Sequence, residues 1–124
     1  MFISNILSSK EGLEKVMGDV VRVLWLYKRL WLSEIYGEIN GMNSSMNEGV
    51  PSYKDVVKAV EELGKKGVVV IDKRVRGSLG SSRGVEDVLV SLIVSDELMK
   101  EIANDEKLYR YRKLREELFK RYRG

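Results

Sequence analysis

The stretch SYKDVVKAVEELGKKGVVVIDKRV, residues 52–75, predicts a helix followed directly by a strand. The helix is indicated by apolar residues at helical spacing, namely Val56, Val57, Val60 and Leu63. Ser52 and Asp55 have the spacing of an N-terminal capping box, and a glycine such as Gly67 commonly ends a helix. The β-branched run over residues 68–75 then predicts a strand.

A second apolar stretch, residues 85–94, predicts the partner strand of a β-hairpin. Between the two strands, residues 76–84 (RGSLGSSRG) have the composition of a hairpin tip. Glycine lets a backbone approach a phosphate chain closely, and arginine can bind phosphate through two hydrogen bonds or enter a narrow minor groove. A solvated polar turn uses the same residue types and is the alternative.

Upstream, apolar spacing predicts a helix that ends near residue 29 and a shorter one over residues 33–40. Trp31 and Leu32 are expected to form a short extended connection between these helices. Residues 41–51 (GMNSSMNEGVP) are rich in Gly, Asn and Ser and predict a loop. The predicted order is therefore helix, helix, loop, helix, strand, tip, strand and a C-terminal helix that begins after Ser95.

The 52–75 stretch resembles the third helix and first wing strand of winged helix-turn-helix proteins, especially MarR- and PadR-type transcription regulators. The matching positions are Val57, Val60 and Leu63 as the buried spine, followed by Gly67 and the apolar strand. The resemblance covers about residues 20–95, roughly three-fifths of the chain. It implies an α+β fold with three helices, a two- to three-stranded β-wing and a long C-terminal helix. The 41–51 loop departs from the family pattern, which has a tight turn there.

This resemblance implies binding to double-stranded DNA in the role of a transcription regulator. The third helix would enter the major groove with its first residues, Ser52, Tyr53, Lys54, Asp55 and Lys58. The wing would contact the DNA backbone through Arg74, Arg76, Ser81, Ser82 and Arg83. Glu61 and Glu62 oppose this interpretation, because they place negative charge on the same helix. The alternative is a winged-helix protein–protein interaction module in an assembly or nucleic-acid-processing complex.

Residues 1–95 are expected to form the winged-helix domain, and residues 96–124 a C-terminal helix that forms a homodimer. The candidate dimerisation residues are apolar or aromatic, namely Trp25, Leu108, Tyr111, Leu118 and Tyr122. The alternative is that the terminal helix folds back on the first helix of its own chain.

The net charge of the 124-residue chain is only +3, but its distribution is uneven. Residues 53–83 contain eight Lys or Arg against four Asp or Glu, and residues 107–124 contain eight against two. Residues 1–50 have five against six. Basic charge is thus concentrated around the hairpin tip and in the tail, which favours an anionic partner.

The absence of Cys, His, Gln and Thr limits the chemistry that the chain can perform. We expect no enzyme activity, no metal and no cofactor, because no carboxylate cluster has metal-ligand spacing and no serine lies in a nucleophile elbow. The GSLGSSRG segment lacks the Gly-Lys-Ser/Thr ending of a phosphate-binding loop. No apolar run is long enough to span a membrane, so we expect a cytoplasmic protein. The composition is typical of heat-adapted proteins and suggests a hyperthermophilic archaeon, or a virus of one, as the source.

Overall fold

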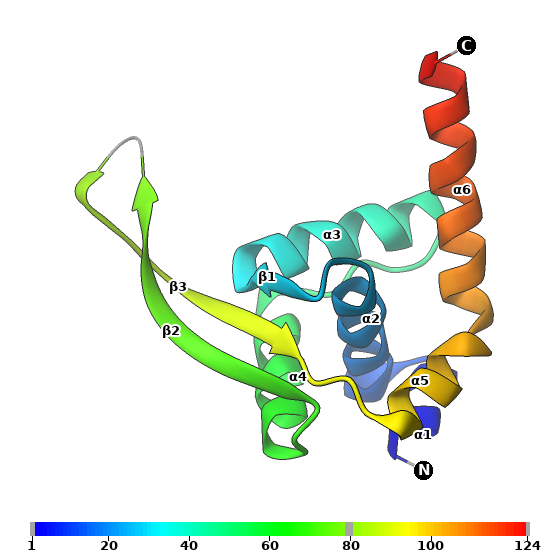
Figure 1. The fold of residues 1–124 in the computed structure, drawn as a ribbon, viewed down its shortest axis with the longest axis horizontal. Helices are drawn as coiled ribbons and strands as arrows, with labels where there is room; N and C mark the ends of the chain where they lie inside the picture. The colour runs from blue at the N-terminus through cyan, green and yellow to red at the C-terminus, as the bar shows by residue number, and fades with distance from the viewer. Residues whose placement is uncertain (1, 79–80, 124) are drawn as a thin grey trace.

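The computed structural model describes the backbone of residues 2–78 and 81–123 and the side chains of residues 2–75 and 87–121. The described chain is an α+β fold of six helices and one three-stranded antiparallel sheet (Figure 1), which confirms the predicted class. In chain order the elements are α1 (Phe2–Ser8), α2 (Gly12–Tyr27), β1 (Arg29–Trp31), α3 (Leu32–Ser45), α4 (Tyr53–Lys65), β2 (Val69–Ser78), β3 (Ser81–Leu92), α5 (Asp96–Ala103) and α6 (Glu106–Arg123).

Helix α2 is the centre of the core. Residues 16–24 are all buried, and Val20 and Leu24 have no exposed surface. Helices α1, α3 and α4 pack around it. Gly18 explains how α1 approaches so closely, because a side chain at this position would overlap the carbonyl oxygen of Ile6. The helix is therefore covered on several sides, as expected from Trp25 and Leu26, which lie off its main apolar stripe.

The sheet has the strand order β1-β3-β2, so β3 lies between the two others. Strand β1 pairs antiparallel with β3 through Arg29, Leu30 and Trp31. The sequence predicted an extended connection at Trp31 and Leu32. The structure places the strand earlier, and Leu32 already begins α3.

Helix α3 is longer than predicted and ends at Ser45, so the connection to α4 shortens to residues 46–52. The low helix propensity of the GMNSS segment is overcome by burial, because Met42 and Asn43 have no exposed surface. The Asn43 amide donates to Asp19 on α2 at 3.1 Å and to the Gly49 carbonyl at 3.0 Å. These contacts fix the end of the helix.

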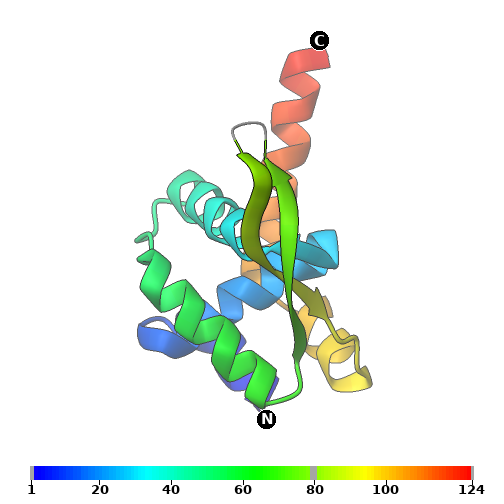
Figure 2. The same cartoon turned by 90° about the vertical axis from the view of Figure 1, so that its left-hand side faces the viewer.

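The β2–β3 hairpin is long and leaves the helical body (Figures 1 and 2). Its strands extend to Ser78 and resume at Ser81, so most of the 76–84 segment predicted as a tip belongs to the strands. Near the body, Val69 and Val90 are buried against the helices.

The predicted single C-terminal helix is interrupted at residues 104–105, which gives two helices, α5 and α6. Asp105 interrupts it, because its carboxylate accepts a hydrogen bond from the Leu108 amide at 3.0 Å and so caps α6. Leu98 and Ile102 of α5 and Leu108 and Tyr111 of α6 are buried in the same core as α2. Residues 96–111 are therefore packed into the body, and the rest of α6 projects from it (Figure 1).

Candidate nucleic-acid interface

Helix α4 begins with the predicted cap. The Ser52 hydroxyl accepts a hydrogen bond from the Asp55 amide at 3.1 Å, which satisfies one of the free N–H groups of the first turn. Tyr53 packs edge-on against Tyr36 of α3, with ring centroids 5.3 Å apart. Ser52 and Tyr53 thus hold the start of α4 in place, although Tyr53 remains 45% exposed.

One side of α4 is buried and the other faces solvent. The buried residues are Val56, Ala59, Val60 and Leu63, whereas Val57, predicted to be buried, is only partly so. Lys54, Asp55 and Lys58, all predicted to contact DNA, are exposed. Glu61 is exposed as well, and Glu62 pairs with Lys65 at 3.3 Å. The exposed side of α4 therefore has nearly balanced charge, and its N-terminal half contains Lys54 and Lys58.

Lys58 and Asp55 also line a hollow of about 550 Å³ between α4 and the start of α2. Lys10 and Lys15 come from the other side of this hollow. Sequence spacing did not single out these two lysines, because Lys10 and Lys15 lie 43 and 38 residues before the first residue of α4, Tyr53. Folding therefore brings Lys10 to the surface near the first turns of α4, whereas Lys15 pairs with Asp19 and Glu48.

The hairpin turns Lys73 and Arg74 to opposite faces. Lys73 is the cross-strand partner of Val88, which packs against the core, so Lys73 lies on the helix-packed face of the sheet. Arg74 is the partner of Asp87 and therefore lies on the opposite face. Its guanidinium bonds to Asp72 at 2.8 Å on the same strand. Arg74, predicted as a wing contact, thus points away from the face that α4 covers, and Lys73, which sequence reasoning missed, points toward it.

The other predicted wing residues, Arg76, Ser81, Ser82 and Arg83, have side chains outside the described residues. Their backbones belong to β2 and β3, so they are part of the projecting hairpin.

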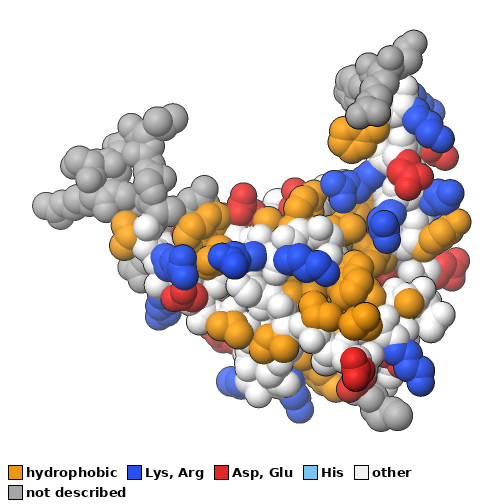
Figure 3. Space-filling view, viewed as in Figure 1, with side chains coloured by type: hydrophobic (Ala, Val, Ile, Leu, Met, Phe, Trp, Pro, Cys, Tyr) orange, Lys and Arg blue, Asp and Glu red, His pale blue; other side chains and the backbone are white. Residues whose placement is uncertain are grey.

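The outer face of the sheet has its own cationic and aromatic side chains. Arg29, Ser91 and Val70 form one cross-strand row on this face. Trp31, Leu89 and Asp72 form the next row. Figure 3 shows Lys and Arg side chains spread across this side of the molecule, with hydrophobic side chains beside them.

The predicted dimerisation residues differ in how far they are buried. Leu108 and Tyr111 are buried in the core of their own chain, so they are not available to a second copy, and this part of the prediction is wrong. Trp25 is partly buried, and Lys28 lies 3.8 Å above its ring. Leu118 is 51% exposed on the projecting part of α6. The Tyr122 side chain lies outside the described residues.

A buried ionic cluster fixes the start of α6 to the body. Lys107 donates to Asp19 at 2.7 Å, to Asn43 at 2.8 Å and to Glu48 at 2.8 Å. Burial would raise the pKa of Asp19, but Lys107, Arg22 and Asn43 outweigh this effect and hold the pKa below its ordinary 3.8. Asp19 therefore stays ionised in the core. The sequence contained no periodic signal for this cluster, which joins four separate segments.

Across the described residues, no group of three or more His, Cys, Asp or Glu could hold a metal ion. No helix in this part of the chain is both long and apolar enough to cross a membrane. No protein-family model matches the chain, and no curated protein or solved structure was found to match it.

Proposed function

We propose that the chain is a winged helix-turn-helix protein that binds double-stranded DNA, with specificity for sequence, and regulates transcription. The order α2, β1, α3, α4 and hairpin supports this proposal, as does the small sheet in which β1 pairs with β3. In this arrangement α3 and α4 are the helix-turn-helix pair, α4 is the recognition helix and the β2–β3 hairpin is the wing.

The observation that carries the proposal is the position of α4 beside the projecting hairpin. Figure 2 shows the helix and the hairpin next to each other on one side of the molecule. Lys54 and Lys58 on α4 and Lys73 on the helix-packed face of β2 are exposed cations of this side. We propose that the α4 lysines approach the major groove and that the hairpin contacts the flanking phosphates.

Two copies would bind together as a homodimer through α6. The projecting part of this helix exposes Leu118 and Phe119, which are 51% and 62% accessible. A projecting helix is marginally stable alone in water, so pairing would stabilise it. Two copies would neutralise roughly six to eight phosphates, which implies that affinity falls steeply as salt rises.

Fluorescence anisotropy of a labelled duplex, measured at low and at physiological salt, tests the proposal. We expect micromolar or tighter binding at low salt and clear weakening at the higher salt. The double variant Lys54→Ala/Lys58→Ala should bind at least about tenfold more weakly. The control Lys100→Ala/Lys113→Ala removes the same charge from α5 and α6 and should bind like the unmodified chain. Absence of binding at low salt would contradict the proposal.

A protein–protein interaction module is the second candidate, because the charges on α4 nearly balance and Arg74 pairs with Asp72. Replacing Arg76 and Arg83 by Ala distinguishes the two functions. A DNA-binding protein should lose affinity for every duplex tested, whereas an interaction module should keep its protein partner.

A further inference from the structure

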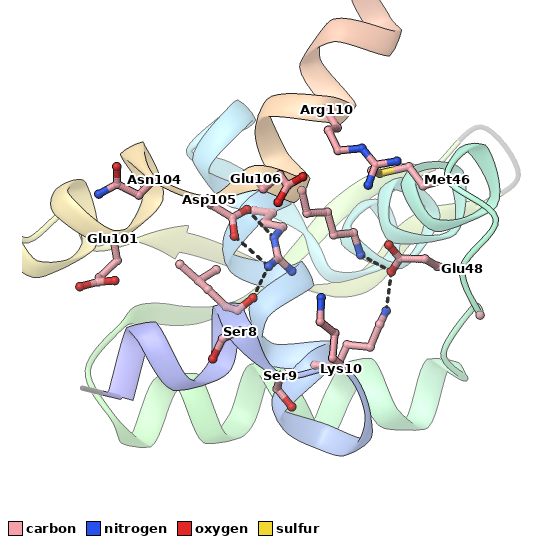
Figure 4. Close-up of a pocket in the computed structure, with 15 residues that line it drawn as sticks. Ser8, Ser9, Lys10, Met46, Glu48, Glu101, Asn104, Asp105, Glu106 and Arg110 are labelled. Carbon is pink, nitrogen blue, oxygen red and sulfur yellow. Dashed lines mark hydrogen bonds and ion pairs between the residues drawn. The ribbon is translucent and has the colours of Figure 1, made fainter.

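A second hollow, of about 780 Å³, lies between the α1–α2 connection, residues 46–49 and the α5–α6 junction. Its volume is in the range of pockets that hold small molecules. Figure 4 shows Lys10 on one side of this hollow, Arg110 on the opposite side and Glu48 beside them. It is distinct from the α4 surface proposed to bind DNA, although Lys10 and Lys15 lie at the border of both.

Five cationic side chains line the hollow: Lys10, Lys15, Arg22, Lys107 and Arg110. Three of them are already neutralised within the fold. Arg22 binds Asp19 and Asp105, while Lys15 and Lys107 share the Glu48 carboxylate at 3.0 and 2.8 Å. Within the part of the chain that the structure describes, Lys10 and Arg110 have no carboxylate partner. Lys10 and Arg110, on opposite sides of the hollow (Figure 4), are thus the two cationic side chains left over for a ligand.

The Glu48 carboxylate lies beside Lys10 and Arg110 (Figure 4), and its pKa shows that this part of the hollow stabilises a negative charge. Burial would raise the pKa of Glu48, but hydrogen bonds from Lys107 and Lys15 lower it below its ordinary 4.5. Glu101 and Glu106 also line the hollow, with Glu106 one helical turn before Arg110 on α6, and these carboxylates would repel an extended polyanion such as a DNA backbone. The arrangement therefore favours a compact anion between Lys10 and Arg110 (Figure 4).

We propose that this hollow binds a small ligand through a carboxylate or phosphate group held by Lys10 and Arg110, next to the Lys15–Glu48–Lys107 bridge. The anion would compete with Glu48 for the two bridging lysines. The segment that contains Glu48 leads directly to Ser52, the cap of α4, and Lys107 and Arg110 belong to α6. If the proposed function holds, a ligand in the hollow would therefore shift the position of both the recognition helix α4 and the dimerisation helix α6.

Isothermal titration calorimetry of the full chain with inorganic phosphate, and separately with succinate, tests the site without DNA. We expect one of the two anions to bind with a Kd of about 0.1–1 mM. Binding of phosphate alone identifies a phosphate ligand, and binding of succinate alone identifies a carboxylate ligand. The double variant Lys10→Gln/Arg110→Gln should weaken binding at least about tenfold. Both side chains are exposed, so this variant should fold normally, which its thermal unfolding curve checks.

The control Lys100→Gln/Arg112→Gln removes the same charge from exposed positions on α5 and α6 that do not line the hollow. It should bind the anion like the unmodified chain. No heat of binding with either anion up to about 10 mM, or equal weakening in the control, would overturn the proposal. Because the titration contains no DNA, its result is independent of whether the chain binds a duplex.

Discussion

The guanidinium of Arg22 on α2 donates two hydrogen bonds to the carboxylate of Asp105, from Nε at 2.7 Å and from Nη2 at 3.0 Å. Both side chains are almost fully buried, with 4% and 7% exposure. Asp105 also caps α6, and Arg22 also binds Asp19 and the Leu7 carbonyl. One ion pair therefore fixes α1, α2 and the α5–α6 junction relative to one another.

The variant Asp105→Asn should lower the free energy of unfolding by about 3 kcal/mol. It keeps the shape of the side chain but leaves the buried Arg22 charge only partly compensated. Urea denaturation followed by circular dichroism measures the change. Glu106→Gln, an exposed position next to it, is the control and should change stability by less than about 0.5 kcal/mol. Equal stability of the two variants would show that the bridge contributes nothing.

Stability should fall in acid because the pKa values of Asp19 and Glu48 are lower in the folded state than their ordinary 3.8 and 4.5. A carboxyl with a lowered pKa binds fewer protons when folded than when unfolded, so its stabilisation is complete above the unfolded pKa and is lost as pH falls. We expect a constant free energy of unfolding from pH 7 to about pH 5 and a progressive loss below it. Urea titrations at several pH values measure this. The variant Lys107→Met removes a main charge partner of Asp19 and Glu48, so its loss of stability in acid should be smaller.

Ser52→Ala removes the side-chain cap of α4 and should cost about 1 kcal/mol of stability. Ser44→Ala alters an exposed serine in the last turn of α3 and serves as the control. Thermal unfolding of the two variants should show a lower Tm for Ser52→Ala alone. The same change should weaken DNA binding, since the first turn of α4 contains the proposed contacts. A Tm equal to that of the control would mean that the hydrogen bond to Asp55 has no net effect.

Two adjacent hairpin residues provide a matched test of the wing. Lys73→Ala should weaken binding to every duplex by about three- to tenfold. It should also reduce the slope of log affinity against log salt concentration by about one, because one phosphate contact is lost. Arg74→Ala should have a smaller effect, because Arg74 lies on the other face of the sheet and pairs with Asp72. Anisotropy titrations at several salt concentrations compare the two. The reverse order of effects would place the DNA on the outer face of the sheet.

Leu118→Glu/Phe119→Glu should convert the proposed dimer into a monomer, because it places charge on the exposed apolar surface of α6. Sedimentation velocity measures the mass of the assembly. Met99→Glu on α5 is also half exposed and is the control, which should leave the dimer intact. A monomer before any substitution would contradict the dimer proposal directly.

The elements that rest on local patterns were predictable from the sequence. Ser52 caps α4 as the spacing of Ser52 and Asp55 indicated, and Val56, Val60 and Leu63 are its buried spine. The hairpin that follows α4 was also predicted, because β-branched runs on either side of a glycine-rich segment favour two paired strands. These features depend on residues within a few positions of one another.

Other features depended on contacts between distant segments and were decided by the tertiary structure alone. Burial of Met42 and Asn43 carries α3 to Ser45, into the 41–51 segment predicted as loop. The register of β2 and β3 determines that Lys73, and not Arg74, lies on the side of α4. Burial of Leu108 and Tyr111 removes them from the proposed dimer surface.

Local spacing along the chain thus determined the helical type of α2 and α4 and the strand type of the hairpin, because capping and periodicity act over one or two turns. The tertiary structure decided where those segments end and which charges meet. Arg22 and Asp105 are 83 positions apart, and no local pattern marks either residue as the partner of the other. Only the packing of α1, α2 and α6 into one core brings them together, because burying either charge alone would cost more than the fold could offset.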